Sequence, residues 1–248
     1  MARVRVRLDQ LLVDLGLEPT RHRARGRILA GDVRIGDRVV DKPGLAVPED
    51  AMPTLRERPR FVSRGGDKLA GALAELALDP RDLECLDAGA STGGFTDCLL
   101  QHGARSVIAV DVGYGQLAGQ LRADSRVRAV DRTNFRHFAR PDDIGPVDLL
   151  TADLAFISLV KVLPRVLEWV RPSGRALLLV KPQFELERGQ VGDGVVRDLE
   201  LRLLAVERVR QAAQSLGFRA LGECESVLPG PKGNRERFLL LEAPPAGT

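Results

Sequence analysis

Residues 86–100 read LDAGASTGGFTDCLL, which combines a short apolar run, three closely spaced glycines and the start of a helical segment. An apolar strand followed by a glycine turn and a helix is typical of a loop that holds a nucleotide cofactor. Dinucleotide-dependent dehydrogenases and S-adenosylmethionine (SAM)-dependent methyltransferases both begin in this way, and a glycine turn that merely joins a strand to a helix also fits. Residues elsewhere in the chain must decide between these alternatives.

The details of this loop favour SAM over a dinucleotide. A dinucleotide fingerprint requires G-x-G-x-x-G, and Ser91 stands where the second glycine would be. Asp87 would repel a pyrophosphate but suits the positive charge of a sulfonium. Asp111 ends the next predicted strand and is placed to accept hydrogen bonds from ribose hydroxyls. The residues predicted to bind the cofactor are Asp87, Gly89, Ser91, Thr92, Gly93, Gly94, Phe95, Asp111, Asp131, Thr133 and Asn134.

Strand-like apolar runs alternate with helical segments over residues 61–248, the larger of two predicted domains. Strands are predicted at residues 84–89, 106–112, 126–132, 147–154, 175–181, 218–227 and 237–243, and helices at 67–78, 159–170 and 199–218. This alternation predicts an α/β fold with an open, mostly parallel, Rossmann-like sheet and helices on both faces. Binding sites in such sheets lie beyond the carboxyl ends of the strands.

Residues 1–60 are predicted to contain a separate, small α+β domain and its linker. A proline-rich joint over residues 46–69 leads to the larger domain. Helices are predicted at 7–17 and 21–31, the second with Thr20 as its N-cap, and a hairpin at 33–40 turns at Gly36. Residues 1–68 hold 15 Lys and Arg against 10 Asp and Glu, whereas the remainder holds 22 against 24. The excess positive charge in this quarter predicts an anionic polymer as partner.

The second predicted helix concentrates four arginines, and the sequence shows no facing carboxylates. Like charges at i,i+4 repel one another, so their crowding favours a role in binding phosphates over the alternative of a solvated basic helix. Residues 7–17 and 20–44, which include both predicted helices and the hairpin, resemble the small RNA-binding domain shared by pseudouridine synthases and tyrosyl-tRNA synthetases. This resemblance implies that structured RNA is the partner. The residues predicted to contact RNA are Arg7, Arg21, Arg23, Arg25, Arg27, Arg34, Lys42 and Arg64.

Four ionisable residues stand at predicted strand ends or beside the first helix of the larger domain: Lys68, Asp153, Lys181 and Glu236. A lysine at the inner end of an apolar run is costly unless it is paired or has a function. The set resembles the Lys-Asp-Lys-Glu tetrad of ribose 2′-O-methyltransferases. This resemblance implies that all four residues are catalytic.

Six blocks make the resemblance more specific: VSRGGDKL, CLDAGASTGGFT, VDVGYGQLA, DLAFISL, LVKPQFE and LPGPKGNRE, at residues 62–69, 85–96, 110–118, 153–159, 179–185 and 228–236. In this order they resemble the TlyA, or haemolysin A, family of ribosomal-RNA 2′-O-methyltransferases over nearly the whole chain. The resemblance implies SAM as cofactor, ribosomal RNA or ribosomal subunits as partner, and cytidine riboses as substrate.

The chemistry of ribose methylation suggests how the four residues divide the work. The cofactor supplies the electrophile, so the protein must position the hydroxyl and remove its proton. We expect Lys181 to be the general base, with Lys68 as a neighbouring cation that favours the neutral amine. Asp153 would orient Lys181, and Glu236 would hold Lys68 or the ribose. The Gly- and Asp-rich residues 187–198 predict a mobile flap beside the site.

The remaining composition narrows the class of protein. No apolar run approaches the roughly 18–20 residues of a membrane span, and the N-terminus lacks the apolar region of a secretory signal. The three cysteines and three histidines show no metal-ligand spacing, so we expect no metal and a cytoplasmic location. The alternatives left open are an NAD-dependent oxidoreductase, a ribosome-assembly factor that only binds RNA, and the membrane-damaging role that the family name suggests.

Overall fold

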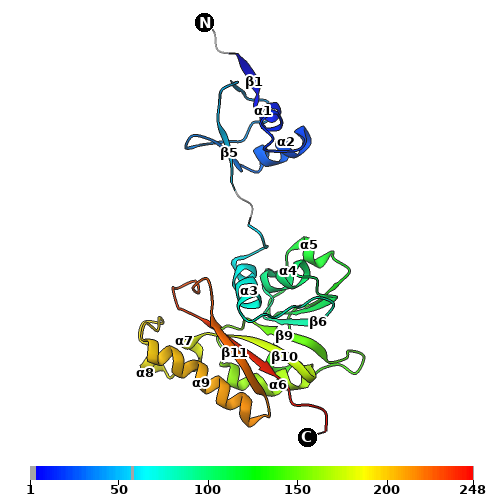
Figure 1. The fold of residues 1–248 in the computed structure, drawn as a ribbon, viewed down its shortest axis with the longest axis vertical. Helices are drawn as coiled ribbons and strands as arrows, with labels where there is room; N and C mark the ends of the chain where they lie inside the picture. The colour runs from blue at the N-terminus through cyan, green and yellow to red at the C-terminus, as the bar shows by residue number, and fades with distance from the viewer. Residues whose placement is uncertain (1–3, 57–58, 248) are drawn as a thin grey trace. The chain divides into compact units, whose positions relative to one another are not determined.

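The computed structural model describes residues 4–56 and 59–247 and separates the chain into two compact units, Met1–Pro59 and Arg60–Thr248 (Figure 1). The first unit contains α1 (Leu8–Asp14), α2 (Arg21–Leu29) and the strands β1 (Arg5–Arg7), β2 (Val33–Ile35), β3 (Arg38–Val40), β4 (Ala46–Pro48) and β5 (Pro53–Leu55). It is the small α+β domain that the sequence predicts.

Local sequence signals explain how this unit folds. Thr20 caps α2, as predicted, because its Oγ1 accepts a hydrogen bond from Arg23 N at 3.3 Å. Gly36 adopts a positive φ at the turn between β2 and β3, which confirms the predicted hairpin. Apolar side chains from both helices and three strands form one small core: Leu8, Leu11, Leu12, Ala24, Ile28, Val33, Val40 and Val47.

The proline-rich joint is shorter than the sequence predicts. Residues 46–55 lie inside the first unit, where β4 pairs with β1 and β5 pairs with β2, both antiparallel. β4 and β5 lie at sheet edges, where proline is tolerated because the missing N–H is not needed by a second neighbouring strand. At the other end, α3 (Arg64–Glu75) already begins within the predicted joint.

The second unit contains a seven-stranded sheet in the order β11-β12-β10-β9-β6-β7-β8. All its neighbouring strands pair in parallel except β12, which runs antiparallel to both β10 and β11. This confirms the predicted mostly parallel α/β fold. The strands are β6 (Glu84–Ala88), β7 (Ser106–Val110), β8 (Val127–Val130), β9 (Val147–Ala152), β10 (Val170–Val180), β11 (Arg219–Glu225) and β12 (Arg237–Glu242).

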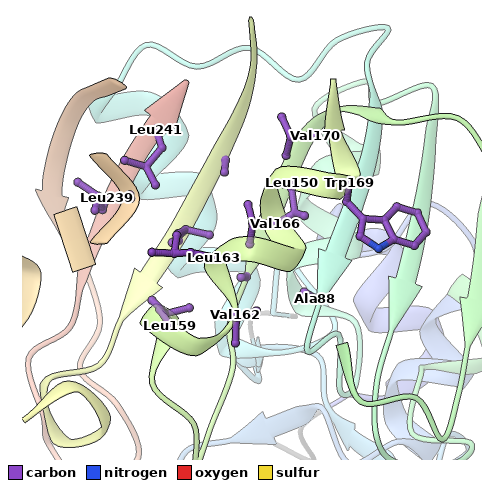
Figure 2. Packing of buried hydrophobic residues seen from close by; sticks show 14 of the residues in the cluster. Ala88, Leu150, Leu159, Val162, Leu163, Val166, Trp169, Val170, Leu239 and Leu241 are labelled. Carbon is purple, nitrogen blue, oxygen red and sulfur yellow. The ribbon is translucent and has the colours of Figure 1, made fainter. Parts of the chain in front are cut away.

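Two apolar layers cover the faces of this sheet. On one face α3 and α4 (Gly94–Gln101) pack over a core that includes Leu69, Phe95 and Phe238. On the other face lie α6 (Leu163–Trp169) and α9 (Leu199–Ser215). Figure 2 shows Val166 of α6 near Leu150 of β9, and Leu163 on the side of α6 toward Leu241 of β12. The remaining helices are α5 (Gly119–Arg122), η1 (Phe135–His137), η2 (Leu159–Lys161), α7 (Pro182–Glu185) and α8 (Arg188–Val191).

One predicted helix is divided in the structure. Residues 159–170 form η2 and then α6, and Pro164 stands in the first turn of α6, where its missing N–H costs no helical hydrogen bond. Within the described parts of the chain, none of the helices has the length and apolarity required to span a bilayer. The order of strands reverses between β6 and β9, and a crevice at such a switch point is the usual place for a ligand in an open α/β sheet.

Candidate functional site

The glycine loop after β6 turns sharply because two of its glycines have no room for a side chain. Gly89 has φ +86°, and a Cβ there would lie 2.6 Å from Asp153 O, so the loop passes directly over the end of β9. Gly93 has φ +99°, and a Cβ would lie 2.3 Å from Leu121 Cδ1. Glycine is the residue that adopts such angles without steric cost.

A large cavity of about 1000 Å³ opens beyond the carboxyl ends of β6, β7 and β9. Asp111 is fixed in its wall, because its carboxylate accepts hydrogen bonds from Ser91 N at 2.8 Å and from Gly113 N at 2.7 Å. Each carboxylate oxygen can accept a further bond, so Asp111 keeps the capacity to bind hydroxyl groups. The residues predicted for the cofactor that line this cavity are Gly89, Ser91, Asp111, Thr133 and Asn134.

A smaller cavity of about 320 Å³ adjoins the larger one, and all four residues of the predicted tetrad line it. Lys68 Nζ lies 2.5 Å from Glu236 Oε2, and Lys181 Nζ lies 2.6 Å from Asp153 Oδ1. Lys68 is 7 % exposed and Glu236 is 1 % exposed, so the first ion pair is almost fully removed from water. Asp153 lines both cavities and therefore stands at their junction.

The topology explains why these four side chains meet. Asp153 and Lys181 follow β9 and β10, which are parallel neighbours, so both residues lie at the same edge of the sheet. Glu236 precedes β12, and because β12 is antiparallel to β10, its beginning lies at that edge as well. Lys68 comes from α3, which packs against α4.

Asp87, predicted as a cofactor residue, lies near the end of β6, directly before the glycine loop. It lines neither cavity and is completely buried, with its Oδ2 accepting hydrogen bonds from Thr96 N at 2.9 Å and Thr96 Oγ1 at 2.7 Å. Asp87 therefore holds the first turn of α4 to the end of β6. Burial, with smaller contributions from the charges of Asp153 and Asp111, raises the pKa of Asp87 to about 7.

This raised pKa predicts a pH-dependent stability. The pKa is higher than the ordinary value of 3.8, so the folded chain binds more protons than the unfolded chain between about pH 4 and pH 7. The free energy of unfolding is therefore expected to fall as the pH rises through this range. Asp87→Asn, which removes the charge, should reduce that fall by about 4 kcal/mol at most. Urea denaturation at pH 5 and pH 8 checks this; parallel pH profiles for variant and wild type would contradict it.

Four other residues predicted to bind the cofactor do not line the larger cavity. Thr92, Gly94 and Phe95 line the smaller cavity instead, beside the tetrad. Gly93 lines neither cavity. It forms the turn into α4 and lies close to the side chain of Leu121.

Asp131, predicted as a cofactor neighbour, is engaged by other groups of the chain. It lines neither cavity; its carboxylate is paired with Arg122 at 2.8 Å and accepts a hydrogen bond from Gly115 N at 3.3 Å. These contacts hold the loop after β7 against the end of β8, so Asp131 has a structural use that the sequence did not reveal.

The larger cavity is also lined by residues that were not predicted from the sequence. Phe156 is 92 % exposed, holds a positive φ of +64°, and its ring centroid lies 5.5 Å from that of Phe184. Glu185 joins the segment after Phe156 to α7, which carries Phe184, because it accepts hydrogen bonds from Ser158 Oγ at 2.6 Å and Leu159 N at 2.8 Å. Burial raises the pKa of Glu185. The missed lining residues include Gln116, Arg136, Phe156, Lys161, Gln183, Phe184 and Arg188.

A signal for these residues was present in the sequence. Phe156 and Phe184 come three residues after Asp153 and Lys181, beyond the ends of β9 and β10, where an aromatic residue has no strand position to fill. An exposed aromatic ring at the mouth of a cavity can stack on a flat ligand.

The arginines of the first unit have more carboxylate partners than the sequence suggested. Arg27, predicted to bind phosphate, is 7 % exposed and lies 3.2 Å from Glu18 and 2.9 Å from Asp32, so carboxylates of the same unit already pair with its guanidinium. Arg7 and Arg21 both pair with Asp9, whose pKa falls to about 2, chiefly because Arg7 hydrogen-bonds to it.

The other predicted RNA contacts remain available at the surface. Arg23 is exposed although it lies 3.6 Å from Glu18. In the second unit, Arg64 is exposed, lines the smaller cavity and donates a hydrogen bond to Pro229 O at 3.1 Å. The predicted RNA contacts of the first unit that are exposed are Arg7, Arg21, Arg23, Arg25, Arg34 and Lys42. Over residues 4–56 and 59–247, no group of three or more His, Cys, Asp or Glu side chains is placed to hold a metal ion.

Comparisons with known proteins agree with this geometry. Residues 61–243 match the FtsJ-like methyltransferase family and residues 6–52 match the S4 domain. The chain is 48 % identical over 244 residues to the 16S/23S rRNA (cytidine-2'-O)-methyltransferase TlyA of Mycobacterium tuberculosis, a match that covers 97 % of this chain and 91 % of that protein.

Two further relatives cover most of the chain. Hemolysin A of Brachyspira hyodysenteriae is 36 % identical over 236 residues, 93 % of this chain and 97 % of that protein. A solved structure from Streptococcus thermophilus, described as a provisional hemolysin, is 39 % identical with a TM-score of 0.73 and covers 100 % of this chain and 92 % of its own. The chain therefore belongs to the FtsJ-like methyltransferase family, with an S4 domain ahead of its methyltransferase domain.

Proposed function

We propose that this chain transfers a methyl group from SAM to the ribose 2′-hydroxyl of cytidines in ribosomal RNA. The observation that carries the proposal is the pair of lysine–carboxylate contacts in one small cavity, directly beside the glycine loop. The name of the 48 % identical relative supports the nucleotide and the RNA, because that protein is a 16S/23S rRNA (cytidine-2'-O)-methyltransferase. We place the reaction in the cytoplasm, where ribosomal RNA is found.

The residues of the larger cavity fit SAM, the methyl donor of this family. SAM carries positive charge at its sulfonium and amino groups, and two carboxylates, Asp111 and Asp153, line this cavity. Asp111 would bind the ribose hydroxyls of the cofactor, and Thr133 and Asn134 would lie near its adenine. When bound, the cofactor supplies an electrophilic methyl group, so the protein needs no further electrophile.

The smaller cavity would receive the ribose of the RNA. We assign Lys181 as the general base, which takes the proton of the 2′-hydroxyl at its Nζ and must be neutral at that moment. Asp153, 2.6 Å from this nitrogen, would hold the side chain in position at the junction with the cofactor cavity. Lys68, held by Glu236 at 2.5 Å, would supply positive charge to stabilise the developing alkoxide.

The proposed function is tested by offering isolated ribosomal subunits and labelled SAM to the pure protein, followed by mapping of the modified nucleotide. Label on the 2′-oxygen of a cytidine is the expected result. Label on a base nitrogen or carbon, or binding of a nicotinamide cofactor in place of SAM, would contradict the proposal. RNA binding without any transfer of label would favour a ribosome-assembly factor.

The S4 domain gives a separate prediction about RNA binding. Replacing the exposed residues Arg21, Arg23 and Arg25 by alanine is expected to lower the slope of log affinity against log salt by about one for each lost phosphate contact. Arg27→Ala should instead lower the stability of the domain, because it leaves buried Glu18 without this partner. Filter-binding at several salt concentrations checks the first expectation; an unchanged slope in the triple variant would refute it.

A further inference from the structure

The loop between β11 and β12 ends at Glu236 and contains a buried asparagine two residues earlier. Asn234 is 2 % exposed, and its backbone carbonyl accepts a hydrogen bond from Gly230 N at 2.8 Å. The loop is thereby closed on itself. A buried amide side chain must find partners for both its oxygen and its nitrogen, so its contacts reveal what it holds.

Both ends of this amide bind one distant segment. Asn234 Nδ2 donates to Gly194 O at 2.8 Å, and Val196 N donates to Asn234 Oδ1 at 2.9 Å. Gly194 and Val196 belong to residues 187–198, the flap segment, which begins beside the larger cavity at Arg188 and ends at the N-cap of α9. Asparagine meets this demand because it donates and accepts at once, whereas an ionised aspartate only accepts.

The same loop also contacts a residue of the tetrad. A Cβ on Gly230 would lie 2.5 Å from Glu236 Oε1, so the loop backbone approaches this carboxylate closely. Glu236 in turn holds Lys68 Nζ at 2.5 Å. Pro229 and Pro231, on either side of Gly230, line the smaller cavity with the tetrad. One short loop thus touches the flap segment through Asn234 and the buried ion pair through Gly230.

We propose that Asn234 is a positioning residue that fastens the flap segment to the loop of Glu236 and so keeps the Glu236–Lys68 pair in its reactive position. Asn234 lines neither cavity and acts through these neighbours. The proposal rests on the proposed ribose methylation, since the reaction supplies its readout. According to this proposal, the reaction requires Asn234 in addition to the four tetrad residues, because Asn234 holds both the flap segment and the loop that carries Glu236.

Asn234→Ala is expected to lower the single-turnover rate of methyl transfer about 10²-fold at saturating RNA and SAM, because small displacements of positioning groups cost rate and not binding. The affinity for SAM should stay unchanged. Ser226→Ala is the matched control: Ser226 is a buried polar residue of the same loop, but its Oγ donates to Leu228 O at 2.8 Å, inside the loop. This control should transfer at close to the wild-type rate.

A second variant separates fastening from general stability. Asn234→Asp has the same shape, and a protonated carboxyl can both donate to Gly194 O and accept from Val196 N. Its rate relative to wild type should therefore rise as the pH is lowered from 8 to about 5.5, whereas the relative rate of Asn234→Ala should not. The charged groups on the loop are Lys232, Glu236 and Arg235, which pairs with Glu225, and the flap segment adds the Asp193–Arg197 ion pair. Both variants retain all of these groups.

Hydrogen exchange of the Val196 amide completes the test, because it requires no substrate. Faster exchange in Asn234→Ala, together with the loss of rate, is the expected result. Wild-type transfer rates in Asn234→Ala, unchanged exchange at Val196, or an equal loss of rate in Ser226→Ala would each overturn the proposal. Failure of the proposed function is recognised separately, because the unsubstituted protein would then methylate no ribosomal RNA.

Discussion

Replacement of Lys181 by alanine is expected to abolish methyl transfer while binding of SAM and RNA persists. General-base catalysis typically contributes 10²–10⁴-fold, and the alanine variant has no group at this position that can accept the 2′-hydroxyl proton. Lys181 lines the smaller cavity and not the larger one, so its loss leaves the walls of the cofactor cavity intact. Single-turnover methylation with saturating RNA and SAM measures the effect, and calorimetry measures the affinity for SAM.

Lys181→Arg distinguishes the two roles that a cation could have here. Arginine keeps the positive charge beside Asp153, but its guanidinium does not lose a proton in this pH range. A variant without activity is therefore expected if Lys181 is the base. A rate close to wild type would show that the residue is an electrostatic clamp, and Asp153, 2.6 Å away, would be the next candidate for the base.

Replacement of Lys68 by methionine is expected to lower the free energy of unfolding by about 3–5 kcal/mol, because it leaves the Glu236 carboxylate buried without its cation. Glu236 is 1 % exposed, so water cannot replace the lost partner. Methionine keeps much of the lysine volume, which limits the contribution of a cavity. Urea denaturation measures the loss, and activity is compared only under conditions where the variant is folded.

Two further variants test the cause of this destabilisation. Lys68→Met combined with Glu236→Gln should recover part of the lost stability, since the second substitution removes the unpaired charge. Lys181→Met should cost less than Lys68→Met, because its partner Asp153 retains contact with water. If Lys68→Met lowers the stability by less than about 1 kcal/mol, the ion pair contributes little to folding.

The fold of the second unit could be predicted because each of its strands corresponds to a separate apolar run in the sequence. Each run between residues 84 and 243 is bounded by glycine, proline or charged residues, and the helical segments between them have a different periodicity. The tetrad was identified for a related reason: an ionisable residue next to an apolar run is at a strand end, and strand ends converge at one edge of a sheet.

Partners that come from distant elements could not be predicted in this way. Arg27 looks like any other arginine on its helix, but Glu18 before the helix and Asp32 after it both point to it in the folded unit. Asp87 precedes the glycine loop as expected, yet its Oδ2 accepts two hydrogen bonds from Thr96 and the residue lines neither cavity. Pairings of this kind depend on side-chain directions that periodicity does not encode.

The walls of the larger cavity were difficult to predict for another reason. Thr133 and Asn134 come shortly after a strand and were predicted, whereas Phe156 lies in a loop and Phe184 in the short helix α7, two segments that the Glu185 hydrogen bonds join. Loops change direction through single residues, such as Phe156 with its positive φ, and no repeating pattern announces such a residue.

The position of β12 has a consequence for how the protein is made. β12 is the last strand of the sheet in chain order, yet it lies between β10 and β11. During synthesis, a nascent chain that has reached β11 cannot finish its sheet, and the edge of β10 stays open to other chains until β12 emerges. Glu236 arrives with this strand, so the ion pair with Lys68 closes at the same time as the sheet. A premature stop or frameshift shortly after β11 would thus remove a whole central strand and leave an aggregation-prone product, although it deletes only a small part of the polypeptide.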